Sequence, residues 1–111
     1  MPNLELATQV ATIISALTSA AQLGISYNRA VSGIDQKQIA RQAKTLVSTY
    51  DDEELDSLKE RLEKCRRRFI TEGDGRQRVR CLCSVLEDAI DGNGGTAPID
   101  DWQDTYDQLC R

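Results

Sequence analysis

The sequence predicts an all-α fold, with a single domain over residues 1–111 built as a bundle of four to five helices. Prolines occur only at positions 2 and 98, so the long stretch between them contains no residue that must interrupt a helix. Aromatic residues make up only 5% of the chain. The core must therefore consist mainly of Leu, Ile, Val and Ala, which suits packed helices better than a β-sandwich.

Residues 4–31 form the first expected helix, which Asn3 can cap and which should kink or break near Gly24. Apolar residues recur along it at three- and four-residue spacing, and its other face carries Ser, Thr and Gln but no charge. An uncharged amphipathic helix is more often a core or oligomer-interface element than a membrane element. The chain is therefore a candidate homo-oligomer through residues 4–31. The residues expected to mediate self-association are Val10, Ile13, Ile14 and Leu17.

The uncharged first helix also invites comparison with membrane segments and signal peptides. A membrane-spanning helix needs roughly 20 predominantly apolar residues, whereas Gln, Thr and Ser interrupt this one every few positions. A signal peptide should begin with Lys or Arg, and the only early charge here is Glu5. The sequence therefore predicts a cytoplasmic location. Disulfides, if present, would argue instead for an oxidising compartment.

Capping signals mark the next two helices. Asp35 with Gln38 predicts a second helix that runs to about residue 49, and Asp51 with Glu54 predicts the start of a third. The third helix, at about 52–71, carries a narrow apolar stripe that steps by three and four positions. Its members are Leu55, Leu58, Leu62, Cys65 and Phe69.

A fourth helix over about residues 76–91 follows a two-glycine turn at 73–75, and Asp74 with Gln77 supplies its start signal. So short a connection predicts that the third and fourth helices form an antiparallel helical hairpin, about 52–71 and 76–91.

The glycine-rich segment 91–95 should end the fourth helix. It resembles a phosphate loop only superficially, because no strand precedes it and no Lys-Ser or Lys-Thr pair follows. Its Asp91 and Asn93 resemble the opening of a calcium loop, but the later glycine and glutamate positions do not match. A last short helix follows, started by Asp100 with Gln103. It should be buried through Trp102, Tyr106 and Leu109.

The four cysteines are the sharpest local feature of the sequence: Cys65, Cys81, Cys83 and Cys110. In the expected hairpin Cys65 lies level with residues 81–83, so one disulfide is within reach there, and Cys110 can pair with the cysteine that is left. In a cytosolic chain, however, a buried cysteine is a small reduced hydrophobe, and Cys65 lies on the apolar stripe. Reduced core thiols are therefore preferred, with disulfides next. A zinc site ranks last, because residues 81 and 83 point apart on a helix and the chain has no histidine.

Basic residues crowd around the expected hairpin turn. With Lys64 they are Arg66, Arg67, Arg68, Arg76, Arg78 and Arg80. One interpretation is a patch that binds an anion or a partner. The preferred interpretation is internal: basic side chains favour a helix C-terminus, and the acidic segment after Cys81 can pack across them. The cluster lacks base-stacking aromatics apart from Phe69, which the core needs, and this argues against nucleic acid as a partner.

Composition argues against an enzyme. The chain has no histidine, which removes the commonest general base and metal ligand. Its net charge of −4 argues against a whole surface that binds nucleic acid or an anionic membrane. No cofactor and no metal are expected. We expect a non-catalytic protein that binds another protein: a helical adaptor, regulator or inhibitor, such as an antitoxin or immunity-type protein in bacterial immunity or defence. The alternatives are a membrane-acting protein that inserts its N-terminal helix and a nucleic-acid-associated regulator that uses the basic hairpin tip.

Overall fold

Six α-helices make up the part of the chain that the structure describes. The computed structural model describes residues 3–71 and 75–111, with side chains for residues 3–71 and 79–111, and no strand is present over these ranges. The helices are α1 (Leu4–Leu23), α2 (Tyr27–Ser32), α3 (Gln36–Thr49), α4 (Asp52–Thr71), α5 (Gly75–Gly92) and α6 (Asp100–Leu109). The all-α prediction is confirmed. One helix more than the expected four to five is present, because α2 forms a short helix of six residues.

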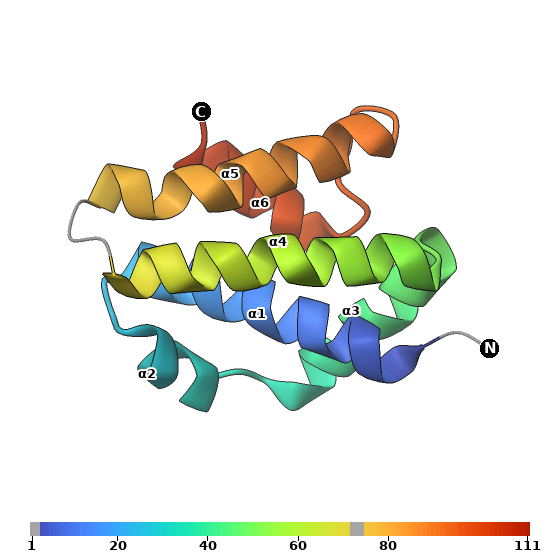
Figure 1. Ribbon diagram of the computed structural model, residues 1–111, viewed down its shortest axis with the longest axis horizontal. Helices are drawn as coiled ribbons and strands as arrows, with labels where there is room; N and C mark the ends of the chain where they lie inside the picture. The colour runs from blue at the N-terminus through green and yellow to red at the C-terminus, as the bar shows by residue number, and fades with distance from the viewer. Residues whose placement is uncertain (1–2, 72–74) are drawn as a thin grey trace.

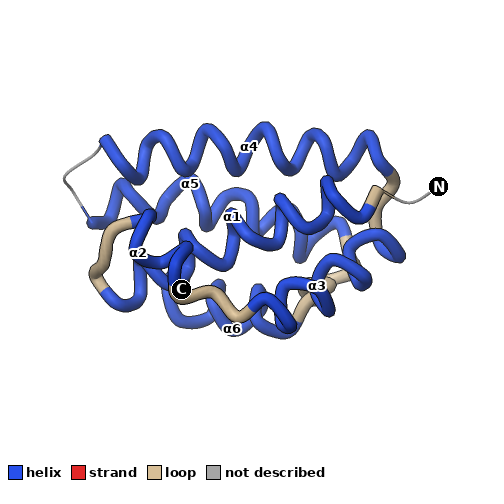
Figure 2. Tube along the Cα trace, turned by 90° about the horizontal axis from the view of Figure 1, so that it is seen from below, coloured by secondary structure: helices blue, strands red, loops and turns tan. Residues whose placement is uncertain are grey.

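Helix α1 lies at the centre of the bundle. It contacts α2, α3, α4 and α5, and Figure 2 shows it between α4 on one side and α3 on the other. Four of its buried residues are alanines, Ala7, Ala11, Ala16 and Ala20. Their small side chains let the neighbouring helices approach closely, while the larger aliphatic residues between them fill the remaining space.

Helices α4 and α5 form the antiparallel hairpin that the sequence predicts. Figure 1 shows the two helices side by side and running in opposite directions, with α6 beside α5. The whole predicted stripe of α4, from Leu55 to Phe69, is buried. The start signal expected for α5 falls on Asp74, which lies outside the described residues, as does the side chain of Gln77.

The predicted break near Gly24 is confirmed, and it divides residues 4–31 into α1 and α2. Gly24 has a positive φ of 66°, and its N–H donates to the Ala20 carbonyl at 3.0 Å. Glycine is suited to this left-handed position because it has no Cβ. The chain restarts at Ser26, whose hydroxyl accepts from the Arg29 N–H at 3.2 Å and caps α2.

The capping predictions at Asn3 and at Asp51 with Glu54 are confirmed. The Asn3 side chain accepts from the Leu6 N–H at 3.0 Å. At the start of α4, the Asp51 carboxylate accepts from the Glu54 N–H at 2.7 Å, and the Glu54 carboxylate accepts from the Asp51 N–H at 3.1 Å. This reciprocal pair is a complete capping box.

Two other capping predictions are only half right. Asp35 caps α3 through the Lys37 N–H at 3.0 Å, but the Gln38 amide donates to Asp101 of α6 instead of closing the box. Helix α6 does begin at Asp100, yet Ile99 holds the cap position and makes no side-chain cap bond. For Gln38, a contact with the distant α6 replaces the local bond. At the start of α6, burial of the apolar Ile99 replaces it.

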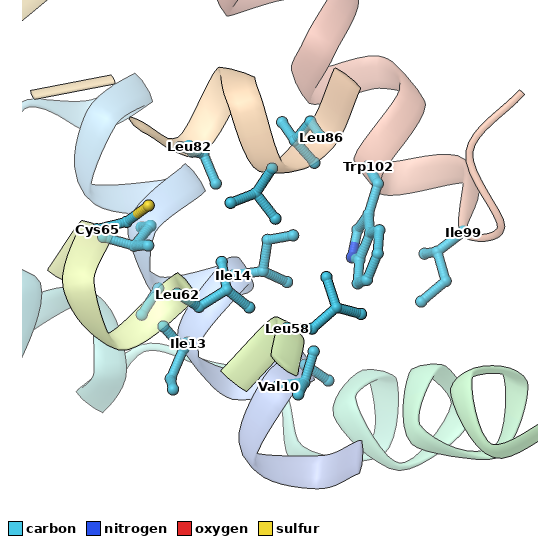
Figure 3. Close-up of a cluster of buried hydrophobic side chains, with 14 of the residues drawn as sticks. Val10, Ile13, Ile14, Leu58, Leu62, Cys65, Leu82, Leu86, Ile99 and Trp102 are labelled. Carbon is cyan, nitrogen blue, oxygen red and sulfur yellow. The ribbon is translucent and has the colours of Figure 1, made fainter. Parts of the chain in front are cut away.

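The four residues expected to mediate self-association lie in the core of the single chain. Val10, Ile13, Ile14 and Leu17 are at most 6% exposed. Figure 3 shows Ile14 of α1 and Leu62 of α4 in one cluster with Leu86 of α5. The apolar face of α1 therefore packs within its own bundle, and no exposed apolar surface remains at these positions for a second copy.

By length and composition α1 is also able to cross a membrane. Within the described residues it is the one helix of this kind, with a mean hydropathy of 1.3 in its most apolar window. In the fold, 44% of the residues in that window are buried. A core helix of a soluble protein and a signal sequence near an N-terminus have the same properties, so this feature alone assigns no membrane role.

Candidate functional site

All four cysteines are paired, which corrects the preference for reduced core thiols. Cys65 of α4 bonds to Cys81 of α5, and Cys83 bonds to Cys110 at the end of α6. The Cα atoms of the two pairs are 5.4 and 5.6 Å apart. Cys65 does lie on the apolar stripe as predicted, but the hairpin brings Cys81 directly opposite it, within disulfide reach.

The alternate faces of α5 explain the pairing. Because two residues advance a helix by about 200°, Cys81 faces α4 whereas Cys83 faces α6. The first disulfide staples the hairpin and the second ties α6 to it. Among the described residues no group of three or more His, Cys, Asp or Glu side chains is placed to hold a metal ion.

A groove lies between α4 and α5 beside the first disulfide, and we call it the basic groove. Its volume is about 460 Å³. It is lined by Arg61, Lys64, Arg67 and Arg68 of α4 and by Cys81, Ser84 and Val85 of α5. Residues 61, 64 and 68 follow the i, i+3, i+7 spacing of one helix face. This face lies next to the buried stripe, so the cations border the apolar seam of the hairpin.

Most of the positive charge in the basic groove is not neutralised. Arg61 forms an ion pair with Asp88 at 2.7 Å, between partly exposed side chains. Over the described part of the chain, Lys64, Arg67 and Arg68 have no carboxylate partner, and all three are exposed. A surface ion pair such as Arg61–Asp88 contributes roughly 0–1 kcal/mol. The groove therefore presents a concentrated positive field on a protein whose net charge is −4.

Arg66, predicted as part of the same patch, faces another way. Its guanidinium binds the Glu63 carboxylate at 2.6 Å and lies 5.7 Å from the centroid of the Tyr27 ring. Burial raises the pKa of the Tyr27 hydroxyl, and the Arg66 charge opposes this with a smaller decrease. Arg66 therefore fastens α2 to α4 through a cation–π contact and is not available in the basic groove.

The remaining predicted arginines are distributed unevenly. Arg80 is exposed on α5, one turn before Ser84 and hence on the same side of the helix. Arg76 and Arg78 have side chains outside the described residues. Arg61 and Ser84 also line the groove but are not among the residues predicted from sequence. The spacing of residues 61, 64 and 68 beside the apolar stripe is a signal that could have identified Arg61.

The acidic segment after Cys81 reaches the basic groove at one point, because Asp88 pairs with Arg61, and Arg68 lies in the last turn of α4 as the internal interpretation expects. Asp101 of α6 accepts from the side-chain amides of Gln38 and Gln42 on α3. Asp107 pairs with Arg111 at 3.3 Å. Asp101 and Asp107 therefore form their described bonds away from the basic groove, and Lys64, Arg67 and Arg68 remain exposed there.

Comparison of the chain with protein-family models, with curated proteins and with solved structures finds no match. The chemistry of the basic groove is therefore the guide to its function. Guanidinium and ammonium groups around a short apolar seam bind carboxylate-bearing or phosphate-bearing surfaces. The Ser84 hydroxyl adds one neutral hydrogen-bonding group to this set.

Proposed function

We propose that this protein is a non-catalytic protein-interaction module, a helical adaptor, regulator or inhibitor of the antitoxin or immunity type, which docks an acidic segment of a partner protein in the basic groove. One observation carries the proposal: Lys64, Arg67 and Arg68 line a single hollow, are exposed, and have no carboxylate partner among the described side chains. Such unpaired positive charge would steer an acidic partner towards this surface and add specificity to its docking.

A protein partner fits the groove better than a nucleic acid. The lining combines cations with the apolar Val85 and the Cys81 disulfide, and it contains no aromatic side chain on which a base would stack. The net charge of −4 would also repel those parts of an extended polyanion that lie outside the basic groove. Nucleic acid is the second candidate, favoured by the exposed Arg80 next to the groove.

Membrane insertion of α1 receives less support. The helix supplies the central part of the core, with Val10, Ile14 and Leu17 at most 1% exposed. Moving α1 into a bilayer would expose the apolar faces of the helices that it now covers, at a large cost in buried area. We therefore place the interaction surface on the hairpin and not on α1.

The two disulfides support action in an oxidising compartment, in contrast to the cytoplasmic expectation. Disulfides persist mainly outside the reducing cytosol, and the structure pairs every cysteine of the chain. Thiol counting on protein purified from its natural source, under denaturing and non-reducing conditions, should find no free thiol.

The proposal is tested by affinity capture from the native organism with three baits. The first is the wild type, and the second carries Lys64→Glu, Arg67→Glu and Arg68→Glu. The third is a matched control with Lys37→Glu, Arg41→Glu and Lys44→Glu, which changes three exposed cations of α3 by the same net charge. We expect wild type and control to capture one stoichiometric protein, and the groove variant to lose it by about tenfold or more, since each charge-assisted contact contributes roughly 1.5–3 kcal/mol.

Other results would overturn the proposal. Equal loss with the groove variant and the α3 control would show that net charge matters and that the groove does not. Capture of nucleic acid without protein, weakening steeply as salt rises, would establish the second candidate instead. Full retention of the protein partner by the groove variant would place the interaction elsewhere.

A further inference from the structure

The first disulfide, Cys65–Cys81, presents its two cysteines unequally to the surface. Cys65 belongs to the buried stripe of α4 and is 1% exposed, and Figure 3 shows its sulfur at the edge of the buried cluster. Cys81 is partly exposed and lines the basic groove. Thiol–disulfide exchange requires access to the sulfur that is attacked. A thiol from solution therefore approaches this disulfide at Cys81 and not at Cys65.

The charges around Cys81 favour an anionic thiol. Lys64, Arg67 and Arg68 line the same hollow, are exposed, and have no carboxylate partner among the described side chains. A thiol that carries carboxylates is attracted into this field, whereas a thiol that carries an ammonium group is repelled. Nearby cations also stabilise a thiolate. The groove therefore stabilises the negative charge that appears on sulfur when the S–S bond breaks.

The second disulfide has a weaker positive environment. Cys83 and Cys110 are both partly exposed, and neither lines the basic groove. One exposed cation, Arg80, lies a turn before Cys83 on α5. On the other side, Asp107 and Arg111 flank Cys110 and pair with each other at 3.3 Å, so their charges offset. The second disulfide therefore serves as an internal comparison for the first.

We propose that Cys81 is a modification site, at which a small carboxylate-bearing thiol opens the first disulfide. The thiolate of the small molecule attacks Cys81 Sγ and forms a new S–S bond with it. The bond between the two cysteines breaks, and its electron pair leaves on Cys65 Sγ, which takes up the proton that the small thiol lost. The products are a mixed disulfide at Cys81 and a thiol at Cys65, so the number of disulfide bonds does not change.

Two features retain the mixed disulfide once it has formed. The carboxylates of the attached molecule lie among the groove cations, which donate charge-assisted hydrogen bonds to them, and the Ser84 hydroxyl lines the same hollow. Burial keeps Cys65 in its neutral form, and a neutral thiol is not the attacking species, so reclosure is slow. The modification releases the staple of the hairpin but leaves α6 tied to α5. It depends on the groove cations and on no protein partner, so it stands or fails separately from the proposed function.

The test compares three small thiols that differ in charge. Glutathione is negative, 2-mercaptoethanol is uncharged and cysteamine is positive. After alkylation and digestion, mass spectrometry follows the mixed disulfide at Cys81, and each rate constant is corrected for the ionised fraction of the thiol. At low salt we expect glutathione to react at least about tenfold faster than cysteamine, with 2-mercaptoethanol between them. The preference should largely disappear at 1 M salt, where the Debye length is about 3 Å, and it should be smaller at Cys83–Cys110 in the same samples.

The two charge variants make the test specific to the groove. The groove variant, with Lys64→Glu, Arg67→Glu and Arg68→Glu, should reverse the order, so that cysteamine reacts faster than glutathione. The α3 control has the same net charge and should keep the order of the wild type. The proposal is overturned if the wild type reacts equally fast with all three thiols, or if the control loses the preference as fully as the groove variant. It is also overturned if both disulfides open together without charge preference, because this marks exchange through the unfolded chain.

Discussion

Leu62→Asp should abolish folding. Leu62 lies in the middle of α4, is 0% exposed, and belongs to the cluster that joins α4 to α1 and α5. A carboxylate at this position would be buried without a partner, the kind of change that costs more than about 4–5 kcal/mol. A domain of this size is stable by only about 5–15 kcal/mol. Circular dichroism and urea titration should therefore find little or no cooperative unfolding in the variant.

Ser57→Asp is the matched control for this prediction. It adds the same charge to the same helix at an exposed position, and its effect should stay within about 0.5 kcal/mol. Leu62→Ala should fall between the two, at about 2–5 kcal/mol. A Leu62→Asp variant that unfolds cooperatively with near wild-type stability would mean that the α4 stripe faces solvent or a partner and not this core.

Removing the disulfides should have the next largest effect. The pairs close segments with sequence separations of 16 and 27 residues. Loss of each restores conformational entropy to the unfolded chain, at a cost of about 3 kcal/mol for Cys65–Cys81 and slightly more for Cys83–Cys110. Together they amount to about 6 kcal/mol, comparable with the whole stability of a small domain. Urea titration with and without reductant should show the protein largely or wholly unfolded when reduced.

Double variants separate the two contributions. Cys65→Ser with Cys81→Ser frees the hairpin, whereas Cys83→Ser with Cys110→Ser frees α6 from α5. Each double variant should be destabilised by about 3 kcal/mol and should still respond to reductant, because one disulfide remains. A variant that lacks all four cysteines serves as the control and should be insensitive to reductant. Equal stability of the wild type with and without reductant would contradict the paired state.

The parts of the fold that were predictable from sequence are those decided within a few residues. The Asp51–Glu54 capping box, the break at Gly24 and the spacing of the α4 stripe all depend on local geometry, and each is present. The level of Cys65 relative to residues 81–83 followed from the short hairpin turn. The oxidation state of Cys65 does not follow from this geometry, because the choice between a thiol and a disulfide depends on the compartment as well as on the distance.

The features that the sequence could not provide join residues far apart in the chain. Gln38 contacts Asp101 over a separation of 63 residues, so the local capping pattern at Asp35 gave no sign of it. Which arginines line the basic groove depends on the helix face that each one occupies. Arg66 faces Tyr27, whereas Arg61 lies in the groove. A run of basic residues in sequence therefore does not tell which helix face each side chain occupies.

Nuclear magnetic resonance can map directly where on this protein the partner binds. The captured partner is added to isotope-labelled protein, and changes in the backbone amide signals are followed residue by residue. Docking in the basic groove predicts that the largest changes fall on residues 61–68 of α4 and 81–88 of α5, and that they diminish at high salt. Changes confined to α1, α3 and α6, with none along the hairpin, would contradict the account.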